Sequence, residues 1–161
     1  MGQLVNGIEV IQPSKENTDY VVLAAVVTDT WYQSDFLYWD TSANKVKKYA
    51  PADSTAHTTN QNAIIGIAGT GKVAGEDRAI VHMKATVLGD ATSMILGADC
   101  VVVYTAATGK YSFWEEAGYN AMREPNITLA SSFAVCADES AEADGRGKIR
   151  LDGVARLAAL T

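Results

Sequence analysis

One stretch of the chain, residues 62–87, constrains the fold more than any other. It begins with the apolar run 63–68, continues through the segment 69–77, which contains three glycines, and ends in residues 79–87. The short length and β-branched residues of the first run favour a buried strand over a helix. In the last part, apolar and polar residues alternate, as is typical of a half-buried strand. The stretch therefore predicts a strand, a turn-rich loop and a second strand.

The loop in this stretch matches part of a nucleotide-binding motif. Residues 66–72 (GIAGTGK) fit the first seven positions of a P-loop. The eighth position should be Ser or Thr, whose hydroxyl binds Mg²⁺, but it is Val73. A P-loop also opens a helix that holds the phosphate, whereas here a strand pattern follows. We therefore predict a glycine-rich hairpin loop in which Lys72 has no nucleotide-binding role.

Other short apolar segments, separated by turn-forming residues, recur along the 161 residues. Together they predict an all-β fold, either a small barrel or a sandwich. Residues 115–122 are compatible with one or two helical turns, which Pro125 would end. The aromatic-rich segment 31–39 is predicted to belong to the core, because such clusters are buried more often than exposed. The predicted strand segments are 20–30, 45–49, 100–104, 110–114, 127–137 and 148–157.

A weak internal similarity divides the chain into two parts. Residues 38–45 (YWDTSANK) resemble residues 103–110 (VYTAATGK), with an offset of 110 − 45 = 65. Later strand segments, 80–83 and 149–151, repeat with a similar offset of 149 − 80 = 69. Similar spacing of similar segments is the sequence signature of a repeated unit. It predicts two related β-units, residues 20–90 and 91–161.

The N-terminal residues 1–19 have apolar side chains without helical periodicity, and two interpretations are open. The segment is either an extended arm that adds to a partner's sheet or the first strand of the same domain. On the first interpretation, its apolar residues are the candidate partner-binding residues. These are Leu4, Val5, Ile8, Val10 and Ile11.

The composition indicates which kinds of partner the chain suits. Its net charge of −6 gives no electrostatic reason to bind nucleic acid or an anionic membrane. We expect no membrane span and no secretory signal, because the apolar runs are too short. Cys100 and Cys136 lie in apolar runs and are predicted to be buried thiols, although a disulfide stays open.

No pattern of residues predicts catalysis, a metal or a cofactor. No G-x-S-x-G elbow is present, and His57 and His82 have no ligand spacing with cysteines or carboxylates. The acidic segment 138–147 does not match the EF-hand pattern, so a solvated loop is favoured. Glu115 and Glu116 are adjacent and would point to opposite faces of a strand. We therefore expect no catalytic, cofactor-binding or metal-binding residues.

Several short segments make the chain resemble the decoration, or cement, proteins of tailed-bacteriophage heads. The likeness is best over residues 20–90. It lies in residues 37–40 (LYWD), 44–46 (NKV), 65–68 (IGIA), 74–76 (AGE) and 80–83 (IVHM).

The resemblance implies a non-enzymatic structural protein of the virion. Such proteins bind the outer surface of the mature head, often as homotrimers at local three-fold axes, and bridge subunits of the major capsid protein. An N-terminal arm commonly reaches onto the shell, which would suit residues 1–19, and residues 20–161 would form the β-rich decoration domain. The alternative is another virion component, such as a tail or fibre protein, or a carbohydrate-binding module with an exposed platform of Trp31, Trp39 and Trp114.

Overall fold

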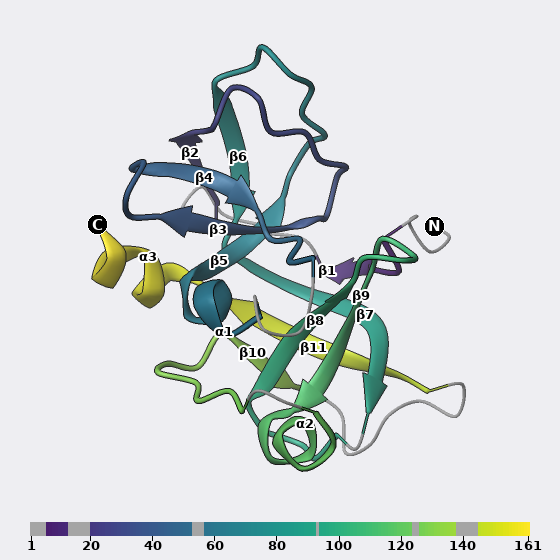
Figure 1. The fold of residues 1–161 in the computed structure, drawn as a ribbon. Coiled ribbons are helices and arrows are strands. Elements are labelled where there is room, and N and C mark those ends of the chain that lie inside the picture. The colour runs from purple at the N-terminus through teal and green to yellow at the C-terminus, as the bar shows by residue number, and fades with distance from the viewer. Residues whose placement is uncertain (1–5, 13–19, 53–56, 93, 124–125, 138–144) are drawn as a thin grey trace.

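The computed structural model of the chain describes residues 6–12, 20–52, 57–92, 94–123, 126–137 and 145–161 (Figure 1). Two β-sheets dominate the structure. The first has the strand order β2 (Tyr20–Ala24), β6 (Arg78–His82), β5 (Ile64–Ala68), β3 (Phe36–Asp40) and β4 (Lys45–Lys48). The second has the order β10 (Ala134–Cys136), β11 (Arg146–Asp152), β7 (Lys84–Thr92), β9 (Lys110–Glu115) and β8 (Cys100–Thr105), and β1 (Glu9–Gln12) pairs with β7.

Short helices lie between and after the strands. They are α1 (His57–Asn60), the 3₁₀ helix η1 (Gln61–Ala63), α2 (Glu116–Met122) and the C-terminal α3 (Val154–Leu160). The all-β prediction is confirmed: the two sheets pack as a sandwich and do not form a closed barrel. Figure 1 shows the first sheet in the upper half of the molecule and the second in the lower half.

The strand predicted over residues 79–87 is in fact two strands in different sheets. β6 ends at His82 and β7 begins at Lys84, while Val81, Met83, Ala85 and Val87 are all buried as the alternation predicted. The carbonyl of Met83, between the strands, accepts a hydrogen bond from the N–H of Gly153 (2.8 Å). The alternation does not reveal the change of sheet, because both strands bury side chains of the same parity.

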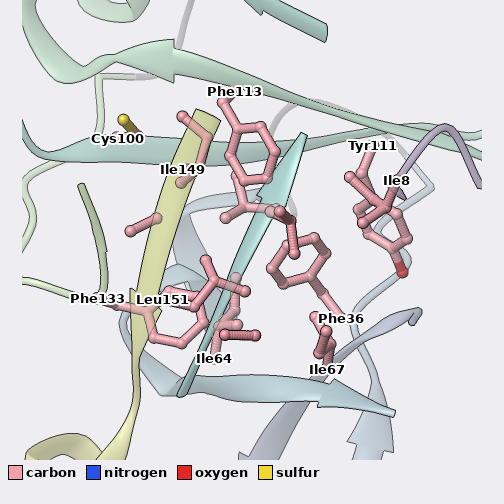
Figure 2. Close-up of a cluster of buried hydrophobic side chains, with 14 of the residues drawn as sticks. Ile8, Phe36, Ile64, Ile67, Cys100, Tyr111, Phe113, Phe133, Ile149 and Leu151 are labelled. Atoms are coloured by element: carbon pink, nitrogen blue, oxygen red, sulfur yellow. The ribbon is translucent and has the colours of Figure 1, made fainter. Parts of the chain in front are cut away.

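A large apolar cluster fills the space between the sheets (Figure 2). Phe36 of the first sheet contacts the rings of Tyr111 and Phe113 of the second edge to face, with centroids 4.9 and 5.7 Å apart. Such contacts add to the free energy gained by burying the rings. The predicted burial of the segment 31–39 holds for Trp31, Phe36 and Trp39, whereas Tyr32 is exposed.

Two strand pairs of the first sheet have counterparts of matching register in the second. In β3–β4, Trp39 lies opposite Val46, and in β8–β9, Tyr104 lies opposite Tyr111. Both members of the pair are displaced by 65 residues (104 − 39 and 111 − 46). Likewise Val22 lies opposite Ile80, and Val87 opposite Ile149, with displacements of 65 and 69. These are the offsets seen in the sequence, and the other pairs of these four ladders follow them too.

The remaining neighbours of the strands also correspond, although the ladders differ in length. Ala25, directly after β2, forms a single parallel bridge with Val46 of β4, where β7 and β9 form a parallel ladder. β3 and β5 form an antiparallel ladder, where Asp99, directly before β8, forms one bridge with Val135 of β10. The halves of the chain are thus two versions of one five-stranded arrangement. The chain passes from the first sheet to the second at Met83, within the unit predicted to end at residue 90.

Cys100 and Cys136 are buried, as predicted, and are not joined in a disulfide. Burial raises the pKa of Cys100 from 9.0 to about 12, and Cys136 nearby adds to the shift. Burial also raises the pKa of Tyr111, whose hydroxyl donates to the carbonyl of Tyr49 (2.6 Å). The folded protein therefore keeps these groups protonated at pH values where the unfolded chain loses the protons.

We expect the free energy of unfolding to fall as the pH rises above 9.0, the ordinary pKa of a cysteine. When folding raises the pKa of a group, the group contributes its full share to the free energy of unfolding at pH values below the unfolded pKa. That contribution is lost as the pH rises towards the folded pKa. Urea unfolding at about pH 8 and about pH 10 measures the change. The Cys100→Ala variant is the control and should show a smaller fall. An equal midpoint at both pH values in the wild type would contradict the expectation.

Candidate interaction surface

Two neighbouring loops form one end of the first sheet. We call them the first tip: residues 25–35, between β2 and β3, and residues 69–77, between β5 and β6 (top of Figure 1). Three of its large apolar side chains are exposed, Val27, Tyr32 (66%) and Val73 (65%). Exposed large apolar side chains are candidates for contact with a partner.

Backbone hydrogen bonds hold the two loops together. Trp31 and Lys72 exchange both of their backbone hydrogen bonds (3.1 and 2.9 Å), and the N–H of Gly75 donates to the carbonyl of Val27 (3.0 Å). Gly75 has a φ of +101°, which a residue without a side chain adopts at little cost. The carboxylate of Glu76 accepts the N–H of Val73 (3.0 Å). The exposed side chains therefore stand on loops of defined conformation.

Lys72, the residue at the lysine position of the apparent P-loop, is buried between the loops. Its ammonium group donates to the carbonyls of Asp29 (2.6 Å) and Val27 (3.2 Å) and lies 5.3 Å from the centre of the Trp31 ring. The loop leads into strand β6, as predicted, and not into a helix. The position of Lys72 is thus explained by the structure of the tip.

We expect the free energy of unfolding of the Lys72→Met variant to be about 2 kcal/mol lower than that of the wild type. The variant loses the charged hydrogen bonds of Lys72, and two carbonyls lose a partner. Methionine keeps the length of the side chain and its packing on Trp31. Urea unfolding followed by tryptophan fluorescence measures the difference. Lys110→Met, at an exposed lysine, is the control and should change little. Equal losses in the two variants would contradict the role of Lys72.

A buried polar network supports the tip from below. Asp35 is almost fully buried, and its carboxylate accepts the N–H of Tyr32 (2.9 Å) and the side-chain amide of Asn6 (2.9 Å). The ammonium group of Lys48 lies 3.4 Å from the same carboxylate. Charge-assisted hydrogen bonds of this kind fix geometry as well as adding stability. The network ties the N-terminal segment to the base of the first tip.

For Ile8 and Val10, the structure corrects the prediction of partner-binding residues in the N-terminal segment. Ile8 is fully buried in the core between the sheets, and Val10 packs against that core. Ile11 is exposed (44%), and Leu4 and Val5 lie outside the described residues. Residues 9–12 form β1, which pairs with β7 of the same chain, so the interpretation as a first strand holds for them. Alternate side chains point inward because β1 pairs within a sheet whose one face lies on the core.

The structure places several of the side chains that the sequence analysis considered for chemistry. Among the described residues, no group of three or more His, Cys, Asp or Glu is placed to hold a metal. His82 packs beside Tyr20, and burial lowers its pKa. Trp31 and Trp39 are buried, so they do not form an exposed platform with Trp114. Residues 138–144 of the acidic segment lie outside the described residues.

Sequence reasoning did not predict that the apolar residues Val27, Tyr32 and Val73 of the first tip form an exposed site. Val27 lay in the apolar run 20–30, which predicted a buried strand, but β2 ends at Ala24. Tyr32 was grouped with its buried aromatic neighbours. Val73 was the clearest available signal, since an apolar side chain inside a turn-rich polar loop has little to pack against.

The comparisons with known proteins add no relative. A scan against models of protein families found no match, and a search of curated proteins found no similar sequence. In the described part of the chain, no helix has the length and apolar character needed to cross a membrane. A functional proposal therefore depends on the fold, the first tip and the sequence resemblance.

Proposed function

We propose that this chain is a non-enzymatic decoration protein of a tailed-bacteriophage head, which binds the outer surface of the mature shell. The first tip carries the proposal: exposed Val27, Tyr32 and Val73 stand on loops that Lys72 holds in place. The partner would be the major capsid protein, and a homotrimer would occupy local three-fold axes of the shell. The sequence resemblance and the all-β sandwich are consistent with this role.

The geometry of the tip suits tight binding to a repeating surface. Loops that are already ordered lose little conformational entropy on docking, so more of the contact energy appears as affinity. Several linked contacts on a lattice add avidity without any new kind of contact. A protein that binds only the mature shell stabilises that state by mass action.

The deciding experiment is a copy-number measurement on purified particles from the source that encodes this chain. Gel densitometry would compare a band at 17.1 kDa with the major capsid protein. Comparable copy numbers would support the proposal. A few copies per particle would instead indicate a tail or vertex component, and absence from the particles would overturn a virion role.

A further inference from the structure

The second sheet carries its own version of the tip. Residues 93–99 connect β7 and β8, whose pairings with β11 and β9 match in register those of β2 with β6 and of β3 with β4. Ile95 (60%) and Leu96 are exposed in this loop. We call residues 94–99 the second tip. Figure 1 places the end of β7 and the start of β8 at the bottom of the molecule, opposite the first tip.

The two tips contain the same backbone turn. In the first, the N–H of Asp35 donates to the carbonyl of Tyr32 (3.2 Å), and Ser34 has a φ of +70°. In the second, the N–H of Ala98 donates to the carbonyl of Ile95 (2.9 Å), and Gly97 has a φ of +82°. A positive φ at the third position is typical of a type II turn. Tyr32 and Ile95 therefore occupy the same first position of the turn, with an offset of 95 − 32 = 63.

The same pair of hydrogen bonds anchors each turn to the neighbouring strand. The N–H of Ser34 donates to the carbonyl of Ala68, whose own N–H donates to the carbonyl of Asp35 (both 2.8 Å). In the second sheet, the N–H of Gly97 donates to the carbonyl of Cys136 (2.9 Å), whose N–H donates to the carbonyl of Ala98 (3.0 Å). Ala68 and Cys136 are the last residues of the corresponding strands β5 and β10. Both turns thus hold an apolar side chain outward on a fixed support.

The exposed charged side chains within the two tips are acidic. Glu76 and Asp77 are exposed in the first tip, and Asp99 is exposed in the second. The only lysine or arginine within the described loops 25–35, 69–77 and 94–99 is Lys72, which is buried. A surface that suits either tip is therefore apolar at its centre and bordered by lysine or arginine.

We infer that the two tips are equivalent docking sites. Tyr32 and Ile95 dock into the same kind of surface, apolar at its centre and bordered by basic residues, on two neighbouring copies of one subunit. A repeating assembly presents such a surface at regular spacing. One chain with two equivalent turns at opposite ends would then bridge adjacent copies. The inference rests on the proposed function, because the repeating assembly is taken to be the phage shell.

Variants that alter one tip at a time test the inference on purified particles that lack the chain. We expect Tyr32→Ser and Ile95→Ser each to bind the particles on the order of 100-fold more weakly than the wild type, because each loses the contact of one tip and with it the avidity of two linked contacts. The double variant should lose binding. Val22→Ser removes an exposed apolar side chain outside both tips and is the matched control, expected to bind as the wild type does. Urea unfolding confirms that the variants are folded.

A second measurement distinguishes bridging of two subunits from binding through one tip. At saturating concentration, the wild type should raise the temperature at which the shells disrupt, whereas either single variant should bind without that effect. The contrary result is that one of the two single variants binds with the affinity of the wild type and raises the disruption temperature of the shells as much. That result would overturn the inference of two docking tips and leave the proposed function standing. If the wild type does not bind the particles, both proposals are overturned.

Discussion

Replacing Arg156 by alanine is expected to lower the free energy of unfolding by about 3 kcal/mol or more. The guanidinium group is buried and donates to the carbonyls of Gln61 and Ile64 (both 3.1 Å) and to the hydroxyl and carbonyl of Ser131 (both 2.8 Å). It also lies over the ring of Phe133 (5.1 Å). The variant leaves these acceptors without their donor and opens a cavity, so the losses add.

The position of Arg156 explains why one side chain has so large an expected effect. Burial lowers its pKa from 12.5 to about 10, so it stays charged at neutral pH and needs these partners. They belong to the 3₁₀ helix η1 and β5 on one side and to the segment before β10 on the other. Arg156 therefore joins the C-terminal helix to both halves of the chain. Gly153, just before α3, permits the close approach, because a Cβ there would overlap the carbonyl of Ile65.

Urea unfolding of Arg156→Ala beside Arg150→Ala measures the effect. Arg150 is exposed on β11 and is the matched control, with an expected change within about 0.5 kcal/mol. Arg156→Lys should retain part of the stability, since an ammonium group cannot reach all four acceptors. A small loss in Arg156→Ala, equal to that of the control, would contradict the role in joining the halves.

Replacing Ile8 by alanine is expected to destabilise the fold by about 2–4 kcal/mol, because the side chain is fully buried and a cavity would remain. Ile8 belongs to the cluster between the sheets (Figure 2). Ile11→Ala removes the same atoms from an exposed position of the same segment and is the matched control, with little expected change. Thermal unfolding of the two variants provides the measurement. Equal melting temperatures would indicate that residues 6–12 contribute little to the core.

This prediction bears on truncated forms of the protein. Removal of residues 1–19 would remove Ile8 and the amide of Asn6 that bonds to Asp35. We therefore expect the truncated protein to be destabilised. A loss of particle binding by that truncation would not by itself show that the segment contacts the shell. The paired isoleucine variants separate the two effects.

Local patterns were enough to predict the class of fold. The alternation in residues 79–87, the glycines of residues 69–77 and the short β-branched runs each favour strands and turns over helices. The repeated offsets of 65 and 69 residues reappeared as the register of corresponding ladders. These features were readable because side-chain periodicity and backbone turns depend on neighbouring residues.

The candidate site was less predictable than the fold. Tyr32 and Trp31 are adjacent aromatic residues, but one is exposed and the other is buried against Lys72. Ile8 and Ile11 are chemically identical, and only the pairing of β1 with β7 determines which one faces the core. Composition does not distinguish the members of such pairs, because their exposure depends on segments distant in the sequence.

The sequence by itself determined the strand-forming segments, the turns between them and the offset that relates the two halves, since these depend on local backbone preferences and periodicity. Tertiary structure decided which sheet each strand joins, which apolar side chains stay exposed and where the charged groups Lys72 and Arg156 are buried. Those outcomes depend on long-range packing, in which every buried donor needs an acceptor and every apolar face needs a partner. The two exposed turns at opposite ends of the molecule are a product of that packing.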